Sequence, residues 1–147
     1  MDDLDNVQWA KLIPELVVSD IDTSLAFYRD RLGFTVLYGR PEDRFAMLDK
    51  EGAQIMLEEK GKNCRFTNGF PTHPYGQGIN FQIEIADVNA LYQSLQEHDV
   101  RIFWPLEEKW YRTGNVEGGN RQFVVADPDG YLLRFFTHLG DRPVEGN

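Results

Sequence analysis

The stretch that decides the fold is RQFVVADPDGYLLRF, residues 121–135. It places two β-type runs, Gln122–Ala126 and Leu132–Thr137, on either side of Asp127-Pro128-Asp129-Gly130. That order of residues favours a tight turn, because proline fixes its φ angle and glycine accepts a positive one. The stretch therefore predicts a β-hairpin towards the C-terminal end of the sequence.

Two longer segments of the sequence repeat one plan. A β-type run over residues 11–19 ends on Asp20, and another over residues 78–86 ends on Asp87. Each aspartate is a good N-cap for the helical pattern that follows, since its carboxylate accepts free backbone N–H groups. The predicted helices carry apolar stripes at helical spacing, formed by Ile21, Leu25, Tyr28 and Leu32 in the first and by Val88, Leu91, Tyr92 and Leu95 in the second.

Three strand candidates follow each predicted helix. They are Phe34–Gly39, Phe45–Asp49 and Ala53–Glu58 after the first, and Arg101–Trp104, Gln122–Ala126 and Leu132–Thr137 after the second. The sequence thus predicts an α+β fold of two βαβββ modules in a single domain, residues 1–147. We assign the first half to about 10–59, a linker to about 60–77, the second half to about 78–138 and a C-terminal tail to 139–147. The stretch Leu106–Asn120 is predicted to be a long irregular loop.

Charge and composition exclude several classes of partner. The formal net charge is -9, which argues against nucleic acid and anionic membranes as binding partners, because both are negatively charged and attract basic proteins. An acidic chain suits a cationic ligand, although plain solubility explains the charge as well. No segment has the roughly 18 apolar residues that span a bilayer, and the acidic start lacks a signal-peptide pattern. The lone Cys64 fits a reducing compartment, so we expect a cytoplasmic protein.

Two of these stretches resemble signatures of a known family. Residues 20–34, DIDTSLAFYRDRLGF, resemble the first-helix signature of the glyoxalase/bleomycin resistance/dioxygenase group, the vicinal oxygen chelate superfamily. Residues 121–135 resemble its last hairpin. With the repeated plan, the resemblance covers roughly residues 10–138. It implies two βαβββ modules that form a cup-shaped mixed and antiparallel sheet. One fold hosts many chemistries, so the resemblance alone does not give an activity.

The resemblance also implies where a metal would bind in the enzymes of this group. Their four ligand positions map onto Ile13, Met56, Asn80 and Arg134 in this sequence. Isoleucine has no donor atom, arginine repels a cation, and methionine and asparagine are poor ligands for hard divalent ions. We therefore expect no metal, no cofactor and no catalytic residue. The pattern is similar to that of the metal-free bleomycin resistance branch, as is the Ile13-Pro14 start of the first strand.

Period-two alternation predicts which side chains face the cup. The packed positions are Leu12, Pro14, Leu16 and Val18 on one strand, and Ile79, Phe81, Ile83 and Ile85 on another. The other face of these strands and of their neighbours is polar and partly anionic, and exposed aromatic residues lie where it opens. The predicted ligand-binding residues are Glu15, Met56, Glu58, Asn80, Gln82, Glu84, Trp104, Trp110, Tyr111, Arg134 and Phe136. The competing interpretation is a solvated outer sheet face.

Three functional hypotheses follow from the sequence. The first is a metal-free protein that binds a small cationic or planar aromatic molecule, such as a bleomycin-class antibiotic, and sequesters it. The second is an enzyme of the same superfamily with a displaced metal site, for example Glu15, Glu84 and His73. The third is a sheet-mediated interaction module without a small ligand. As implied by the resemblance, we expect a homodimer, in which residues 2–10 reach over the partner.

Overall fold

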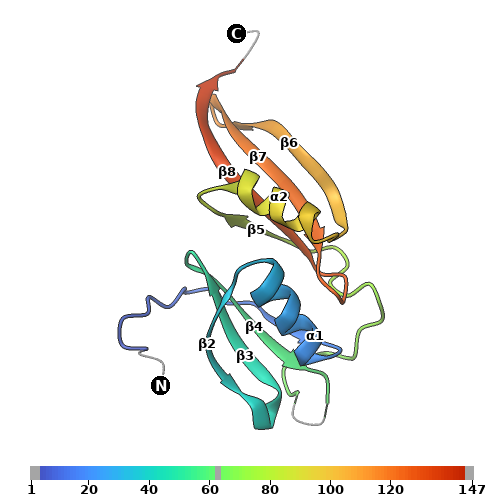
Figure 1. Ribbon diagram of the computed structural model, residues 1–147. Coiled ribbons are helices and arrows are strands. Elements are labelled where there is room, and N and C mark those ends of the chain that lie inside the picture. The colour runs from blue at the N-terminus through green and yellow to red at the C-terminus, as the bar shows by residue number, and fades with distance from the viewer. Residues whose placement is uncertain (1–3, 62–63, 145–147) are drawn as a thin grey trace. The chain divides into compact units, whose positions relative to one another are not determined.

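Two four-stranded sheets, each with its own helical segment, make up the described chain (Figure 1). The structure is a computed structural model that describes residues 4–61 and 64–144. The chain divides into two units, each described by itself below. Unit 1 runs up to Gln77 and includes the turn Asp127–Tyr131, whereas unit 2 comprises Gly78–Ala126 and the residues from Leu132 onward.

Unit 1 forms its sheet from four strands in the order β1-β4-β3-β2. Strand β1 is parallel to β4, and the other neighbours are antiparallel. The elements in chain order are β1 (Glu15–Val18), α1 (Ile21–Leu25), the π-helix η1 (Ala26–Arg31), β2 (Thr35–Arg40), the 3-10 helix η2 (Pro41–Asp43), β3 (Phe45–Lys50) and β4 (Ala53–Glu59).

Unit 2 repeats this plan with strands in the order β5-β8-β7-β6. Here β5 is parallel to β8, and the remaining pairs are antiparallel. The elements are β5 (Asn80–Glu84), α2 (Val88–Glu97), β6 (Ile102–Thr113), β7 (Val116–Ala126) and β8 (Leu132–Pro143). The α+β fold with two βαβββ modules, predicted from the sequence, is confirmed.

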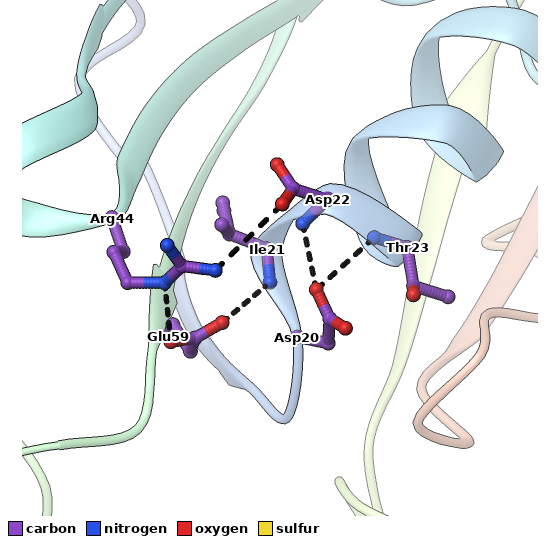
Figure 2. A network of polar contacts seen from close by, with 6 residues as sticks. All are labelled: Asp20, Ile21, Asp22, Thr23, Arg44 and Glu59. Carbon is purple, nitrogen blue, oxygen red and sulfur yellow. Dashed lines mark hydrogen bonds and ion pairs between the residues drawn. The ribbon is translucent and has the colours of Figure 1, made fainter.

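Aspartate caps begin both helical segments. In unit 1, Asp20 accepts hydrogen bonds from the N–H groups of Asp22 and Thr23, and Glu59 at the end of β4 accepts from Ile21 N–H (Figure 2). Glu59 is also ion-paired with Arg44. The Arg44 guanidinium and the Ile21 N–H group lower the pKa of Glu59, so a charged carboxylate faces the positive end of the helix.

The helical segments differ in winding. After Leu25 the first widens into π-type turns, so that Leu32 N–H donates to Phe27 O, five residues back. The second is a regular α-helix capped by Asp87, whose carboxylate accepts from Ala90 N–H. No helix in residues 4–61 and 64–144 is long and apolar enough to cross a membrane.

The core of each unit lies between its helix and one face of its sheet, here called the helix-packed face. The predicted packed positions Leu16, Val18, Ile83 and Ile85 are buried, as expected. The prediction is wrong for two residues that precede their strands, because Leu12 is 85% exposed and Ile79 is 56% exposed. The residues with no exposed surface in the core include Tyr28, Leu32, Leu48, Leu57, Leu95, Phe123, Leu133 and Phe135.

The largest difference from the sequence prediction lies at Leu106–Asn120. This stretch is no irregular loop, because β6 and β7 continue through it and turn at Gly114 and Asn115. Register shifts between Ile102 and Glu107 interrupt the alternation that would have revealed a strand. Likewise β8 runs to Pro143, so residues 139–143, assigned to a tail, are strand. Residues 145–147 lie outside the described part.

The turn Asp127–Tyr131 belongs to unit 1 and is held there by hydrogen bonds. The Tyr28 hydroxyl donates to Asp127 Oδ2 at 2.8 Å, Ser19 donates to Asp129 through its N–H at 2.9 Å, and the Tyr131 hydroxyl donates to Val17 O. Burial raises the pKa of Asp127 to about 6, although the hydrogen bond from Tyr28 opposes the shift.

Candidate functional site

The face of the unit 1 sheet opposite its helix, the open face of unit 1, carries the predicted residues Glu15, Met56 and Glu58. Glu15 on β1 lies beside Met56 on β4, and two residues further along β4 is Glu58. Phe45 on β3 is the direct neighbour of Glu58 on its other side. The structure therefore brings these three predicted residues onto one surface, in the order that strand alternation gives.

A cavity of about 340 Å³ opens on this face. Glu15, Phe45 and Glu58 come from three adjacent strands. The rest of the lining comes from the end of β2, from η2 and from the segment after β4. The full lining is Glu15, Arg40, Asp43, Phe45, Glu58, Arg65 and Phe66. Five of these residues were absent from the sequence prediction. Alternation along β3 could have revealed Phe45, whereas the others depend on turns.

One of the two glutamates of the cavity has a raised pKa. Burial and a hydrogen bond with Glu15 raise the pKa of Glu58 to about 7, and the charge of Glu15 adds to the effect. Arg40 opposes the shift. The neighbouring Glu59 points to the helix side and has a lowered pKa. Two consecutive carboxyl groups of β4 thus have opposite pKa shifts, because Glu59 caps the helix and Glu58 is buried beside Glu15.

Cationic groups already lie against the aromatic rings of this cavity. The Arg40 guanidinium carbon sits 3.9 Å from the centre of the Phe45 ring, and Arg40 also pairs with Asp43 at 3.1 Å. Arg65 lies 5.1 Å from the ring of Phe66, whose side chain is 76% exposed. The cavity therefore offers carboxyl groups and ring faces, the two features that bind an organic cation.

The N-terminal segment covers the other end of the open face of unit 1. The Gln54 side chain, on the same face of β4 as Met56, accepts from Ala10 N–H at 2.8 Å and donates to Gln8 O at 2.9 Å. Trp9 meets Tyr38 of β2 edge to face. Residues 8–10 therefore contact their own chain at Gln54. The predicted reach of residues 2–10 over a partner stays a prediction. Residues 2 and 3 of that prediction lie outside the described residues.

The open face of unit 2, again opposite the helix, carries most of the other predicted residues. On β5, Gln82 and Glu84 lie beside Arg134 and Phe136 of β8, and Asn80 begins the strand opposite Leu132. On β6, Trp104 pairs with Val124 and Tyr111 with Gly118, both on the same face of β7 by alternation. Trp104 is 52% exposed and Tyr111 is 37% exposed.

A chain of hydrogen bonds that the sequence did not predict runs along this face. The indole N–H of Trp104 donates to Glu107 at 3.1 Å, and the side-chain amide of Gln122 donates to Glu107 at 2.8 Å and to the Tyr111 hydroxyl at 2.6 Å. The bonds from Gln122 and Trp104 lower the pKa of Glu107. Sequence analysis did not predict Glu107 because the register of β6 is irregular there. It did not predict Gln122 because no sequence pattern distinguishes this residue.

Trp110 lies on the opposite face of unit 2 from Tyr111. Its indole covers Gly119, where an added Cβ would meet ring atoms at 2.7 Å, and the Arg142 guanidinium carbon lies 4.1 Å from the ring centre. Its ring N–H donates to Glu108. Gly119 shares its face of β7 with Phe123 of the core. The prediction that Trp110 sits in a loop at the mouth of the cup is wrong, because it is part of β6.

The four positions where the resemblance implies metal ligands do not fit a divalent ion. Ile13, Met56, Asn80 and Arg134 offer neither an imidazole nor a carboxylate. No group of three or more His, Cys, Asp or Glu side chains in the described chain could hold a metal ion. His73, named in the displaced-site alternative, is exposed. Burial raises the pKa of Cys64, which keeps this thiol protonated.

Comparisons with known proteins agree on one family. The family model described as Glyoxalase/Bleomycin resistance protein/Dioxygenase superfamily matches residues 11–135. A protein named bleomycin resistance protein, from Geobacillus stearothermophilus, is 32% identical over 138 residues, 86% of this chain and 96% of the relative.

Two solved structures are similar over most of the chain. A protein of unknown function from Agrobacterium tumefaciens is 28% identical with a TM-score of 0.66, covering 93% of this chain and 100% of that one. TioX from Micromonospora sp. ML1 is 25% identical with a TM-score of 0.65, covering 88% and 99%. The likeness therefore extends over both units.

Proposed function

Because the chain belongs to the glyoxalase/bleomycin resistance protein/dioxygenase superfamily, we propose that it is a metal-free small-molecule-binding protein of the bleomycin resistance type. The family itself, predicted from residues 20–34 and 121–135, is confirmed. The proposed ligand is a cationic or planar aromatic compound such as a bleomycin-class antibiotic, and the proposed action is sequestration. Support comes from the relatives that bear this name and from the open face of unit 1.

The observation that carries the proposal is the cavity in which Glu15 and Glu58 lie beside Phe45. Burial and the neighbouring Glu15 raise the pKa of Glu58 to about 7, and a ligand cation placed here would stabilise the charged form of Glu58 in place of the proton. The exposed ring of Phe66 in the same lining offers cation–π attraction of about 0.5–2 kcal/mol, whereas Arg40 already lies against Phe45. A cavity of about 340 Å³ is within the usual range for small-molecule sites.

The residues at the family's metal positions also support binding over metal chemistry. A catalytic zinc site needs three protein ligands, and the set Ile13, Met56, Asn80 and Arg134 supplies no good one. Protein purified without chelator should accordingly carry no stoichiometric zinc, nickel, iron or manganese. Elemental analysis that finds about one metal ion per chain would overturn the metal-free part of the proposal.

The proposed contacts in unit 2 are the predicted residues on its open face. They are Asn80, Gln82, Glu84, Trp104, Tyr111, Arg134 and Phe136. Trp110 is left out, because its ring already covers Gly119 and meets Arg142. We further propose a homodimer in the cytoplasm, as the resemblance and the single cysteine lead us to expect. Light scattering at micromolar concentration tests the dimer, and cell fractionation tests the location.

Calorimetric titration with metal-free bleomycin tests the function directly. Binding in the micromolar range is expected, and Glu15→Gln or Glu58→Gln should weaken it about five- to tenfold. The matched control is Glu42→Gln, which removes the same charge from an exposed position outside the cavity lining. No heat and no tryptophan quenching at hundred-micromolar bleomycin would rule out the antibiotic as ligand. An equal loss of bleomycin affinity in Glu42→Gln would show that the effect comes from the net charge of the protein and not from the cavity.

A further inference from the structure

The Arg40 side chain lines the cavity of unit 1 and lies on the ring of Phe45. Arg40 ends β2 and is the direct cross-strand neighbour of Phe45 on β3, and Phe45 is in turn the neighbour of Glu58 on β4. These three residues therefore form one row across three strands of the open face. The guanidinium carbon of Arg40 is 3.9 Å from the centre of the Phe45 ring, which is the separation of groups in contact.

Two acidic residues complete the surroundings of this guanidinium. Asp43 in η2 accepts from Arg40 Nε–H at 3.1 Å. Burial and Glu15 raise the pKa of Glu58 to about 7, and the charge of Arg40 opposes this shift. The Arg40 guanidinium thus has an aromatic ring on one face, a carboxylate at its Nε edge and a second carboxyl group within electrostatic reach. A planar organic cation is bound by the same combination of groups.

The second arginine of the cavity leaves its aromatic neighbour open. Arg65 lies 5.1 Å from the centre of the Phe66 ring, and Phe66 is 76% exposed. Phe45 is only 5% exposed although it lines the same cavity, and Arg40 lies on its ring. The Arg40 side chain is itself 46% exposed, so it can leave the ring towards solvent.

We propose that Asp43, Phe45 and Glu58 form a subsite for a planar cation, such as a guanidinium or amidinium group, and that Arg40 occupies this subsite when no ligand is bound. A ligand with such a group displaces the Arg40 guanidinium from the Phe45 ring and donates to Asp43 in its place. This inference rests on the proposed small-molecule binding and specifies the shape of the cation. Because Arg40 is tethered to β2, its effective concentration at the ring is high, and it weakens every ligand that needs the same place.

A planar cation matches these groups better than a tetrahedral one. The face of a guanidinium stacks on an aromatic ring while its N–H groups point outward to carboxylates. A quaternary ammonium also interacts with a ring face, but it has no N–H group to donate to Asp43. The competing interpretation is that Arg40 only holds η2 against β3 through Asp43 and Phe45. In that case, removing Arg40 lowers stability and does not raise the affinity for a cation.

Calorimetric titration of the full-length protein with benzylguanidinium tests the proposal. Arg40→Ala should bind this probe about tenfold more tightly than the parent, because the ring and Asp43 become free. Benzyltrimethylammonium has the same ring and charge but a tetrahedral head, and its affinity should rise by about threefold at most. An affinity for benzylguanidinium in folded Arg40→Ala that is no higher than in the parent would overturn the subsite.

Two further variants separate release of the ring from loss of positive charge. Arg40→Met removes the charge but keeps a side chain that covers the ring, and Arg65→Ala removes the same charge elsewhere in the cavity lining. Each should raise the affinity for benzylguanidinium by about threefold at most, since exposed charges contribute little. Gains in these variants as large as in Arg40→Ala would show that charge alone is responsible, and would contradict the proposal.

The Nε–H signal of Arg40 in the ¹⁵N-labelled parent protein reports the displacement directly. At saturating benzylguanidinium it should move to the position of a free arginine, because Arg40 loses both the Phe45 ring and the hydrogen bond to Asp43. An Arg40 signal that stays in place at saturation would show that the probe binds elsewhere, and the subsite would then be rejected.

Titration with bleomycin separates this inference from the proposed function. If the parent binds bleomycin and Arg40→Ala shows no gain for benzylguanidinium, the proposed function stands and only the subsite is lost. If Arg40→Ala shows the gain and no variant binds bleomycin, the subsite stands and the antibiotic is ruled out as the ligand.

Discussion

The open faces of the two units differ far more than their helix-packed faces. Both units have the same strand order and the same aspartate caps, and both bury aliphatic and aromatic residues under the helix. On the open side, unit 1 has Glu58, whose pKa is raised by burial and by Glu15, whereas unit 2 has Glu107, whose pKa is lowered by hydrogen bonds from Gln122 and Trp104. The two units are alike on their helix-packed faces, where packing restricts the choice of side chain. On their open faces packing imposes no such restriction, and the two units carry different polar groups.

The largest effects should come from the helix-packed faces, and they should be alike in both units. Leu57→Ala and Leu133→Ala each remove a side chain with no exposed surface and should destabilise the protein by about 3–4 kcal/mol. The open-face neighbours Met56→Ala and Leu132→Ala should cost about 1 kcal/mol. Urea unfolding measures all four. If the open-face variants were equally costly, the distinction between the faces would fail.

The pH dependence of stability in Asp127→Asn tests whether the pKa of this unit 1 carboxyl group is raised. Its folded pKa of about 6 lies above the ordinary 3.8, so the folded state binds the proton more tightly than the unfolded state. The protonated Asp127 carboxyl therefore adds to the free energy of unfolding. This stabilisation is fully present below about pH 3.8 and is lost as the pH rises through 6. Over that range the parent should lose on the order of 3 kcal/mol relative to Asp127→Asn. Parallel stability curves for the two proteins from pH 4 to pH 7 would show that Asp127 binds no extra proton on folding.

The raised pKa of Glu58 predicts pH-dependent binding in unit 1. Because the pKa of Glu58 is about 7, this carboxyl group gains its negative charge as the pH rises through 7. Benzyltrimethylammonium, whose charge does not titrate, should therefore bind about tenfold more tightly at pH 8 than at pH 6. Calorimetry measures the affinity, and Glu58→Gln should remove the pH dependence. If the affinity of Glu58→Gln still depends on pH, the titrating group is a residue other than Glu58.

The two tryptophans of β6 should show the smallest effect and the sharpest contrast between faces. Trp104→Ala removes a half-exposed ring from the open face of unit 2 and should weaken bleomycin binding about threefold. Trp110→Ala should change the affinity by less than twofold, since its ring covers Gly119. Titration of each variant with bleomycin measures the two affinities. A larger loss for Trp110→Ala would return this residue to the binding site.

Sequence patterns predict the fold well because the helix-packed faces follow regular periods. The caps Asp20 and Asp87, the stripes through Tyr28 and Leu95 and the turn at Gly130 are all local signals. Alternation also places Glu15 and Glu58 on one face. It fails on β6, where the register shifts before Glu107 change which face the later residues occupy, so that Trp110 lies on the helix-packed side and Tyr111 on the open side. The sequence carries no signal for a contact such as that of Arg40 with Phe45, because that depends on which partners the fold supplies.

The turn Asp127–Tyr131 has a consequence for how the protein can be divided. Unit 1 obtains these five residues from a position fifty residues or more beyond its own last strand and linker. A fragment that ends at Gln77 would leave the Tyr28 hydroxyl without its carboxylate and Ser19 without Asp129. Although the two units repeat one plan, unit 1 includes a turn that comes from the second half of the sequence. Split versions of the protein should regain structure only when both pieces are present together.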